Sequence, residues 1–170
     1  KASEDLYEGC FDKYQKAVEI KPDYHAALNN WGTALLALAK TKTGKASEDL
    51  YEGCFDKYQK AVEIKPDYHE VFYNWGAALL DLAKTKTGKA SEDLYELSFD
   101  KLKKGVENGG ESYNLSCAYA LCSKKKEALQ YLTISLENNE VSAKFVEDDD
   151  DWKAYENDKD FISLIQKYKK

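Results

Sequence analysis

The chain has 170 residues, with 31 acidic and 25 basic side chains, a net charge of −6 and a pI near 5.1. All the basic side chains are lysines, and nucleic-acid binding depends on clustered Lys and Arg, so we expect no nucleic-acid partner. No apolar run approaches the roughly 18 residues of a membrane span, so we expect no membrane partner.

Near-identical copies of a 44-residue unit organise the sequence. Residues 1–44 and 45–88 agree at 38 of 44 positions, and KASEDLYE begins a third time at Lys89. A fixed period of this size is typical of arrays in which short supersecondary units stack on one another. The sequence therefore predicts a repeat protein, arising from recent duplication or from deliberate copying.

The array begins with half a unit. Residues 1–24 repeat the second helix of the unit, and no first helix stands before them. The apolar stripe of this lone helix would normally pack on a preceding partner. We therefore expect an exposed face that favours self-association, giving a homo-oligomer through residues 1–24.

Each full unit reads as two amphipathic helices. In the unit's longer helix, Cys54, Tyr58 and Ala61 recur at three- and four-residue intervals. Ser47 is the predicted N-cap of this helix, and Pro66 is expected to end it after Ile64.

The other helix of the unit runs from about Tyr68, with Asp67 as its predicted N-cap, and carries Phe72, Trp75 and Leu79 on one face. No segment alternates polar and apolar residues as a strand does. The expected fold class is all-α, with extended repeats at residues 25–68 and 69–110.

The C-terminal third departs from the repeated unit. A third long helix over residues 90–107 is expected to stop at Gly109 and Gly110, which stand where earlier copies have lysine and proline. A shorter repeat follows at residues 111–139, with helices over 112–122 and 125–138. Residues 140–170 mix aromatic and charged residues, as expected of capping helices that cover the end of an array.

This pattern resembles the tetratricopeptide repeat (TPR) family, in positions that recur along residues 1–139: Leu28, Trp31, Gly32, Leu35, Cys54, Tyr58, Ala61 and Pro66. The resemblance implies a right-handed α-solenoid of antiparallel helix pairs, a TPR-like superhelix with a concave groove that binds peptides or proteins. The period exceeds the family's by ten residues, which fall between Leu38 and Cys54. We expect both helices of a pair to be lengthened at the same end.

The differences between the two near-identical copies cluster on the first helix of the pair. At 100° per residue, positions 26, 29, 33 and 37 fall in a wedge about 80° wide, opposite the apolar residues. Recognition of a partner by these side chains would explain the clustering of the differences. Sequence drift or deliberate editing on an exposed face would also explain it. The resemblance implies that the wedge faces a ligand through Asn29, Thr33, Glu70, Tyr73, Ala77 and Asp81, with Tyr113 and Cys117 in the shorter repeat.

A recurring asparagine forms the second candidate feature. Asn30, Asn74 and Asn114 stand at matching positions, where a carboxamide can both donate to and accept from a ligand backbone. In some family members such residues form a ladder along the groove. The alternative is that each bonds the backbone of a neighbouring helix.

The charges of the wedge suggest the chemistry of a partner. Glu70 and Asp81 would repel a carboxylate, so we expect a neutral or basic peptide or protein segment with an apolar anchor against Tyr73. The leading hypothesis is a non-catalytic protein-binding scaffold. The alternative is a structural, self-assembling repeat module that associates through its first helix.

No motif of catalysis, metal binding or cofactor binding is present, so we expect neither an enzyme nor a cofactor. His25 and His69 occupy one repeated position, which indicates packing or capping. The run Asp148 to Asp151 lacks the pattern of a calcium loop and indicates solvated charge or a helix start. The cysteines have no metal or redox spacing and read as small core residues in a reducing, cytoplasmic setting: Cys10, Cys54, Cys117 and Cys122.

Overall fold

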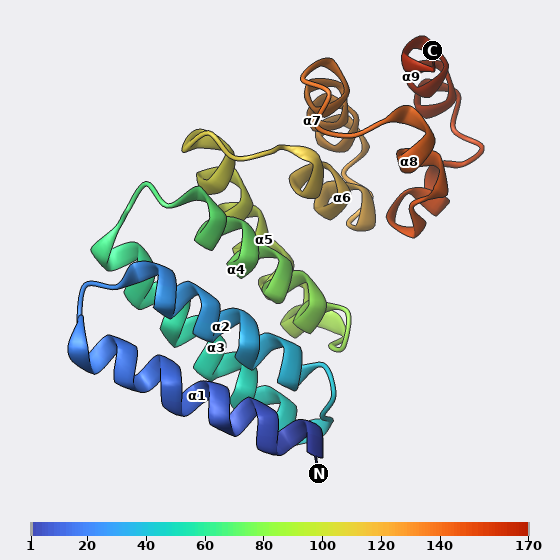
Figure 1. Ribbon diagram of the computed structural model, residues 1–170. Helices are drawn as coiled ribbons and strands as arrows, with labels where there is room; N and C mark the ends of the chain where they lie inside the picture. The colour runs from blue at the N-terminus through green and yellow to red at the C-terminus, as the bar shows by residue number, and fades with distance from the viewer. Residues whose placement is uncertain (1, 170) are drawn as a thin grey trace.

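The computed structural model describes the backbone of residues 2–169 and the side chains of residues 6–169, and that part of the chain contains helices and no strand (Figure 1). The all-α prediction is confirmed. The helices pack in adjacent pairs that stack in chain order. They are α1 (Ala2–Ile20), α2 (His25–Ala39), α3 (Gly44–Ile64), α4 (His69–Ala83), α5 (Gly88–Glu107), α6 (Tyr113–Leu121), α7 (Lys125–Glu137), α8 (Ala143–Asp148), the 3-10 helix η1 (Asp150–Tyr155) and α9 (Lys159–Tyr168).

The long helices begin earlier than the sequence predicted. Helix α3 starts at Gly44 after an extended Thr43, so Ser47 lies within the first turns and is not the N-cap. The Ser47 hydroxyl instead donates to the backbone oxygen of Ala39 at 2.9 Å and ties α3 to the end of α2. Helix α4 likewise begins after Tyr68 with no side-chain cap, so the prediction of Asp67 as N-cap is wrong.

The glycine stop after α5 is confirmed. Gly109 has φ +89°, and the amide of Gly110 donates to the oxygen of Gly105 at 2.9 Å. The amide of Gly109 donates to Val106 at 3.0 Å, which completes the pair of bonds that terminates a helix through a left-handed residue. The chain therefore leaves α5 in a tight turn without side chains at Gly109 and Gly110.

The extended pairs are longer than the C-terminal pair in both helices. Helices α2 and α4 have 15 residues each, and α3 and α5 have 21 and 20, whereas α6 and α7 have 9 and 13. The additional residues lie at the end of α2 and the start of α3, where the Ser47 hydroxyl donates to the backbone oxygen of Ala39. The same hydroxyl-to-carbonyl bond recurs at 2.9 Å between Ser91 and Ala83, which confirms lengthening of both helices at one end.

A glycine lets the two helices of each extended pair approach closely. A Cβ placed on Gly32 would lie 2.6 Å from the ring of Tyr58, and one on Gly76 would lie 2.5 Å from Leu102. A lysine covers the neighbouring tryptophan in both pairs, with Lys57 Nζ 4.3 Å from the centre of the Trp31 ring. The repeated Trp-Gly sequence is thus a packing device of the helix pair.

The buried apolar residues form two clusters, one centred on α2, α3 and α4 and the other on α5 to α9. In the second cluster Trp152 stacks on Phe161 with ring centres 5.2 Å apart, and Ile165 packs beside them. Residues 140–169 thus close this end of the stack against α6 and α7.

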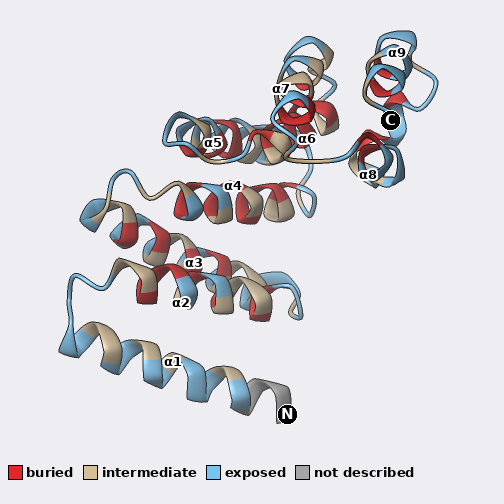
Figure 2. Ribbon diagram, turned by 45° about the horizontal axis from the view of Figure 1, so that its top comes forward, coloured by how far each residue is buried: buried red, intermediate tan, exposed pale blue. Residues whose placement is uncertain are grey.

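None of the described residues of helix α1 is buried, whereas every later helix contains buried residues (Figure 2). Phe11 and Val18 contact the first cluster from outside. Cys54 and Cys117 are buried, as predicted for small core residues, but Cys10 is exposed. The core prediction is wrong for Cys10, because none of the described helices covers that face of α1.

Candidate functional site

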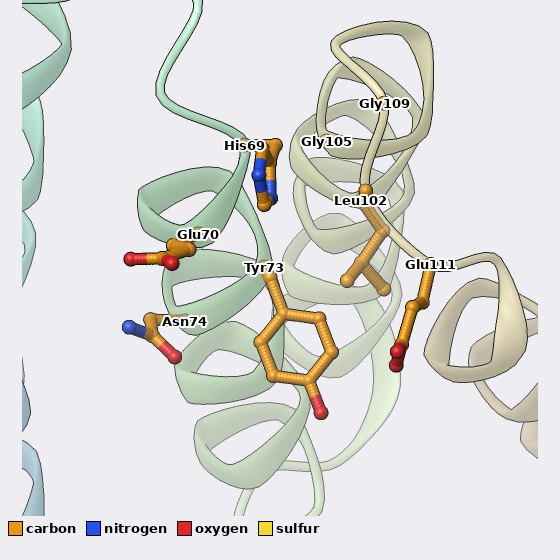
Figure 3. A pocket seen from close by; sticks show the side chains of 9 residues that line it. His69, Glu70, Tyr73, Asn74, Leu102, Gly105, Gly109 and Glu111 are labelled. Carbon is orange, nitrogen blue, oxygen red and sulfur yellow. The ribbon is translucent and has the colours of Figure 1, made fainter. Parts of the chain in front are cut away.

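A cleft of about 490 Å³ opens between α4, the end of α5 and the loop that leads to α6 (Figure 3). Tyr73 stands at its centre with its side chain 39% exposed. Leu102 of α5 lies beside the Tyr73 ring, and the Glu111 side chain borders the opening from the loop. The cleft is lined by His69, Glu70, Tyr73, Asn74, Leu102, Gly105, Gly109, Gly110 and Glu111.

Three glycines at the end of α5 and in the turn after it line the cleft. Counted from the shared KASEDLYE start, Gly105, Gly109 and Gly110 stand where the preceding copy has alanine, lysine and proline. The left-handed turn at Gly109 requires glycine. A Cβ on Gly105 would lie 3.5 Å from the backbone oxygen of His69, and one on Gly110 would lie 2.9 Å from the oxygen of Gly105. Glycine in this copy therefore lets the end of α5 and the turn after it pack closely against α4 beside the cleft.

A second cleft of about 330 Å³ adjoins the first between α4, the start of α6 and α8. Tyr73 and Glu111 line both clefts, so we call the two together the Tyr73 groove. The far end carries Phe145, whose side chain is 56% exposed. The second cleft is lined by Tyr73, Glu111, Tyr113, Asn114, Glu140, Val141, Ser142 and Phe145.

Tyr113 fixes the wall of the second cleft. Its hydroxyl donates to Asp149 Oδ2 at 2.7 Å, and its ring meets Phe145 edge-on with centres 5.8 Å apart. Burial raises the pKa of the Tyr113 hydroxyl, which keeps the donor protonated. The bond to Asp149 joins α6 to the C-terminal cap, so the α8 side of the groove is held in place.

Glu140 holds the base of the second cleft. Its carboxylate accepts from the Ser112 amide at 2.8 Å and from the Ser112 hydroxyl at 3.0 Å, and the Ser135 hydroxyl also donates to it. Burial alone would raise the pKa of the Glu140 carboxyl, but these hydrogen bonds lower it below its ordinary value. Glu140 therefore stays ionised and links the start of α6 to the end of α7.

The Tyr73 groove is acidic. Glu70, Glu111 and Glu140 are carboxylates among its lining residues, and no lysine lines either cleft. Carboxylates around an apolar floor favour a cationic or neutral ligand over an anionic one. The groove thus combines aromatic surface with negative charge.

Of the residues predicted to face a ligand, the Tyr73 groove brings together Glu70, Tyr73, Asn74, Tyr113 and Asn114. Asn74 is not directed only at the cleft, because its amide donates to the side-chain oxygen of Asn29 at 3.0 Å. This bond joins α4 to α2 through side chains, and so differs from both the ligand ladder and the helix-backbone bond that the sequence suggested.

The remaining predicted residues lie outside the lining of the groove. Asn29 and Cys117 are buried, so these side chains do not face solvent as their place on the wedge predicted. The stacking of α4 beside α2 closes over Asn29, since both helices lie on the same side of the array. Asn30 is exposed and Ala77 is half-buried.

Two members of the wedge are engaged within the protein. The Thr33 hydroxyl lies 3.2 Å from the hydroxyl of Tyr58 on α3. Asp81 pairs with Lys40 at 2.6 Å, across the ends of α4 and α2. These polar contacts give the two positions a structural role in joining neighbouring helices.

Sequence reasoning missed the part of the groove that does not belong to the first helices of the pairs. Leu102 lies on α5, Glu111 on a loop, and Phe145 on α8, whereas the predicted surface was restricted to one face of α2, α4 and α6. One feature of the sequence did indicate this part of the groove. Gly109 and Gly110 stand where the preceding copy has lysine and proline, which predicts a different wall at this repeat.

Two buried thiols of the described chain have raised pKa values. Burial raises the pKa of the Cys54 thiol and of the Cys117 thiol to about 12, so both are protonated and weak nucleophiles at neutral pH. No cluster of three or more His, Cys, Asp or Glu that could hold a metal occurs among the described residues. In the acidic run, Asp149 caps η1 by accepting from the Asp151 amide at 2.9 Å.

Comparison with known proteins adds no relative. No protein-family description matches the sequence, and no curated protein matches it. Among the described helices, none is both long enough and apolar enough to cross a membrane. The function therefore has to be argued from the geometry of the Tyr73 groove.

Proposed function

We propose that this protein is a non-catalytic scaffold of the TPR type, a right-handed superhelix of helix pairs, which binds a peptide or protein segment in the Tyr73 groove. The observation that carries the proposal is the meeting of two clefts at a half-exposed tyrosine. Tyrosines in such positions are frequent anchors of binding energy, because the ring is large and loses little conformational freedom. A reducing, cytoplasmic setting suits its unpaired cysteines.

The lining of the groove suggests the ligand. The half-exposed ring of Tyr73 offers an apolar surface for an aromatic or aliphatic anchor, and the exposed ring of Phe145 offers another. The carboxylates of Glu70 and Glu111 favour a neutral or basic segment. Clefts of about 490 and 330 Å³ lie in the range that holds small ligands or single side chains.

A displayed library of random 12-residue peptides tests the proposal. We expect the selected peptides to be neutral or basic and to carry an aromatic or aliphatic residue. Tyr73→Ala should weaken binding of a selected peptide at least about tenfold, or 1.4 kcal/mol, whereas Tyr73→Phe should retain most of it. Fluorescence anisotropy of the labelled peptide measures the difference.

Asn30→Ala supplies the matched control, because Asn30 is exposed on α2 and does not line the groove. Its affinity should equal that of the unchanged chain. Rising salt should weaken the basic peptides, as expected for partly exposed charges. Enrichment of acidic peptides, or equal affinity of Tyr73→Ala and the unchanged chain, would contradict the proposal.

A further inference from the structure

Lysine side chains repeatedly cover aromatic rings in this protein. Lys101 Nζ lies 4.1 Å from the centre of the Trp75 ring, and Lys124 Nζ lies 4.6 Å from the centre of the Phe99 ring. A cation over the face of a ring is attracted by the negative charge of that face. The chain thus pairs many of its rings with its own cations.

Tyr73 is an exposed ring without such a cover. Three aromatic side chains of the described residues are exposed, namely Tyr24, Tyr73 and Phe145. Lys21 Nζ lies 5.4 Å from the centre of the Tyr24 ring, and Phe145 meets the ring of Tyr113. Tyr73 has neither a cation nor a second ring against it within the described chain, and its hydroxyl makes no hydrogen bond there. The ring is therefore free to contact a ligand in the first cleft.

Glu111 is the carboxylate of the groove that also lacks a partner. It stands on the loop after α5, across the first cleft from Tyr73 (Figure 3). Glu111 is exposed, and its carboxylate forms no ion pair or hydrogen bond with the other described residues. By contrast, Glu140 accepts hydrogen bonds from two serines. Glu70 lies beside the hydroxyl of Tyr68, whose pKa is raised to about 12 by burial and by this carboxylate.

The two unpartnered groups complement a cation. A cationic side chain in the first cleft would cover the Tyr73 ring as Lys101 covers Trp75, and it would pair its charge with Glu111. No lysine among the described residues lines the cleft, so the positive charge has to come from the ligand. An anion would be repelled by Glu111, and a purely aromatic group would leave that carboxylate unpaired.

We propose that the first cleft of the Tyr73 groove is the subsite for a cationic side chain, arginine or lysine, of the bound segment. The aliphatic stem of this side chain lies against the Tyr73 ring and its charged head pairs with Glu111. The aromatic or aliphatic anchor of the segment then lies at Phe145 in the second cleft. This inference rests on the proposed function and assigns different parts of one ligand to the two clefts.

Paired peptides that differ only in one charge test the subsite. Peptides selected from the random library should contain arginine or lysine. A selected peptide is compared with a copy in which citrulline replaces the arginine, or acetyl-lysine the lysine, so that the side chain keeps its stem and loses its charge. The neutral copy should bind the unchanged chain at least about tenfold more weakly in fluorescence anisotropy. Equal affinities would overturn the proposal.

Variants of the chain locate the charge that the peptide meets. With Glu111→Gln, the charged and neutral peptides should bind within about threefold of each other, because the carboxylate that separates them is gone. Glu107→Gln removes an exposed carboxylate that lines neither cleft, and it should keep the full preference for the charged peptide. A preference that persists in Glu111→Gln, or that Glu107→Gln removes as well, would overturn the assignment to Glu111.

A small probe separates the failure of this inference from the failure of the proposed function. Millimolar N-acetylarginine methylamide should shift the amide NMR signals of residues 69–74 and 109–112 saturably, and its citrulline analogue should not. Equal or absent shifts would overturn the cation subsite. Tyr73-dependent peptides that bind without a charge preference would also overturn it and leave the proposed function in place, whereas peptides that bind regardless of Tyr73 would contradict the proposed function itself.

Discussion

Single glycines decide how closely the helices approach, and the duplicated sequence allows the same substitution to be compared at different places. Gly32 lies under the Tyr58 ring, whereas a Cβ on Gly9 of α1 would meet nothing within 4 Å. Gly32→Ala should destabilise the fold by about 1–2 kcal/mol, because overpacking outweighs the gain in helix propensity. Urea denaturation measures the change.

Gly9→Ala is the matched control for that prediction. It gains helix propensity with no clash and should stabilise the protein by about 0.5–1 kcal/mol. Equal effects of the two substitutions would show that the glycine at position 32 has no packing role.

The thiols give a second prediction at the residue scale. Cys10 and Cys54 have identical neighbours in sequence, but Cys10 is exposed and burial raises the pKa of Cys54 to about 12. Iodoacetamide near neutral pH should alkylate Cys10 in the folded protein and reach Cys54 only on unfolding. A mass-spectrometric time course separates the two sites, and simultaneous modification would contradict the burial of α3.

Between elements, Glu140 links the start of α6 to the end of α7 through Ser112 and Ser135. Its pKa is lowered in the folded protein, so its contribution to stability is present above the ordinary value of 4.5 and is lost as the pH falls through the lower folded-state value. Glu140→Gln should be less stable at neutral pH and should lose less stability on acidification.

Urea denaturation at neutral pH and below the folded-state pKa of Glu140 checks this pH dependence. Glu107→Gln, which removes an exposed carboxylate at the end of α5, is the control and should follow the unchanged chain. A Glu140→Gln protein with the full acid sensitivity of the unchanged chain would contradict the role assigned to these hydrogen bonds.

Helix type and pairing could be predicted from the sequence because apolar periodicity and the 44-residue period depend on the chain itself. The stop at Gly109 was also predictable, since it rests on local backbone conformation. The start of α3 was not, because Ser47 bonds Ala39 of the preceding helix, and that bond depends on how the pair packs. A local capping rule cannot anticipate a tertiary partner.

The candidate site was only partly predicted, because neighbouring helices also decide which of its side chains are exposed. Tyr73 and Glu70 were found from the differences between copies, but Asn29 was placed on the ligand face although α4 covers it. A helical wheel describes one helix, and burial on the inner side of an array depends on the helix stacked next to it. The walls supplied by Glu111 and Phe145 come from outside the repeated unit.

At the scale of the whole molecule, a stacked array gains stability from each contact between neighbours, so its end helix contributes least. Tyr58→Ala should cost about 3–5 kcal/mol, as expected for a fully buried aromatic side chain. Tyr14→Ala, the same change in the same local sequence, should cost less than about 1 kcal/mol. Urea denaturation of both variants checks the difference, and similar losses would show that α1 is packed as tightly as α3.

Amide hydrogen exchange with and without a selected peptide tests most directly whether a partner binds in the Tyr73 groove. We predict slower exchange at residues 69–74 and 105–114, which line the groove from α4 and from the α5–α6 junction. Protection confined to α1 and α2, or no change at the groove with a peptide that binds, would contradict binding in the Tyr73 groove.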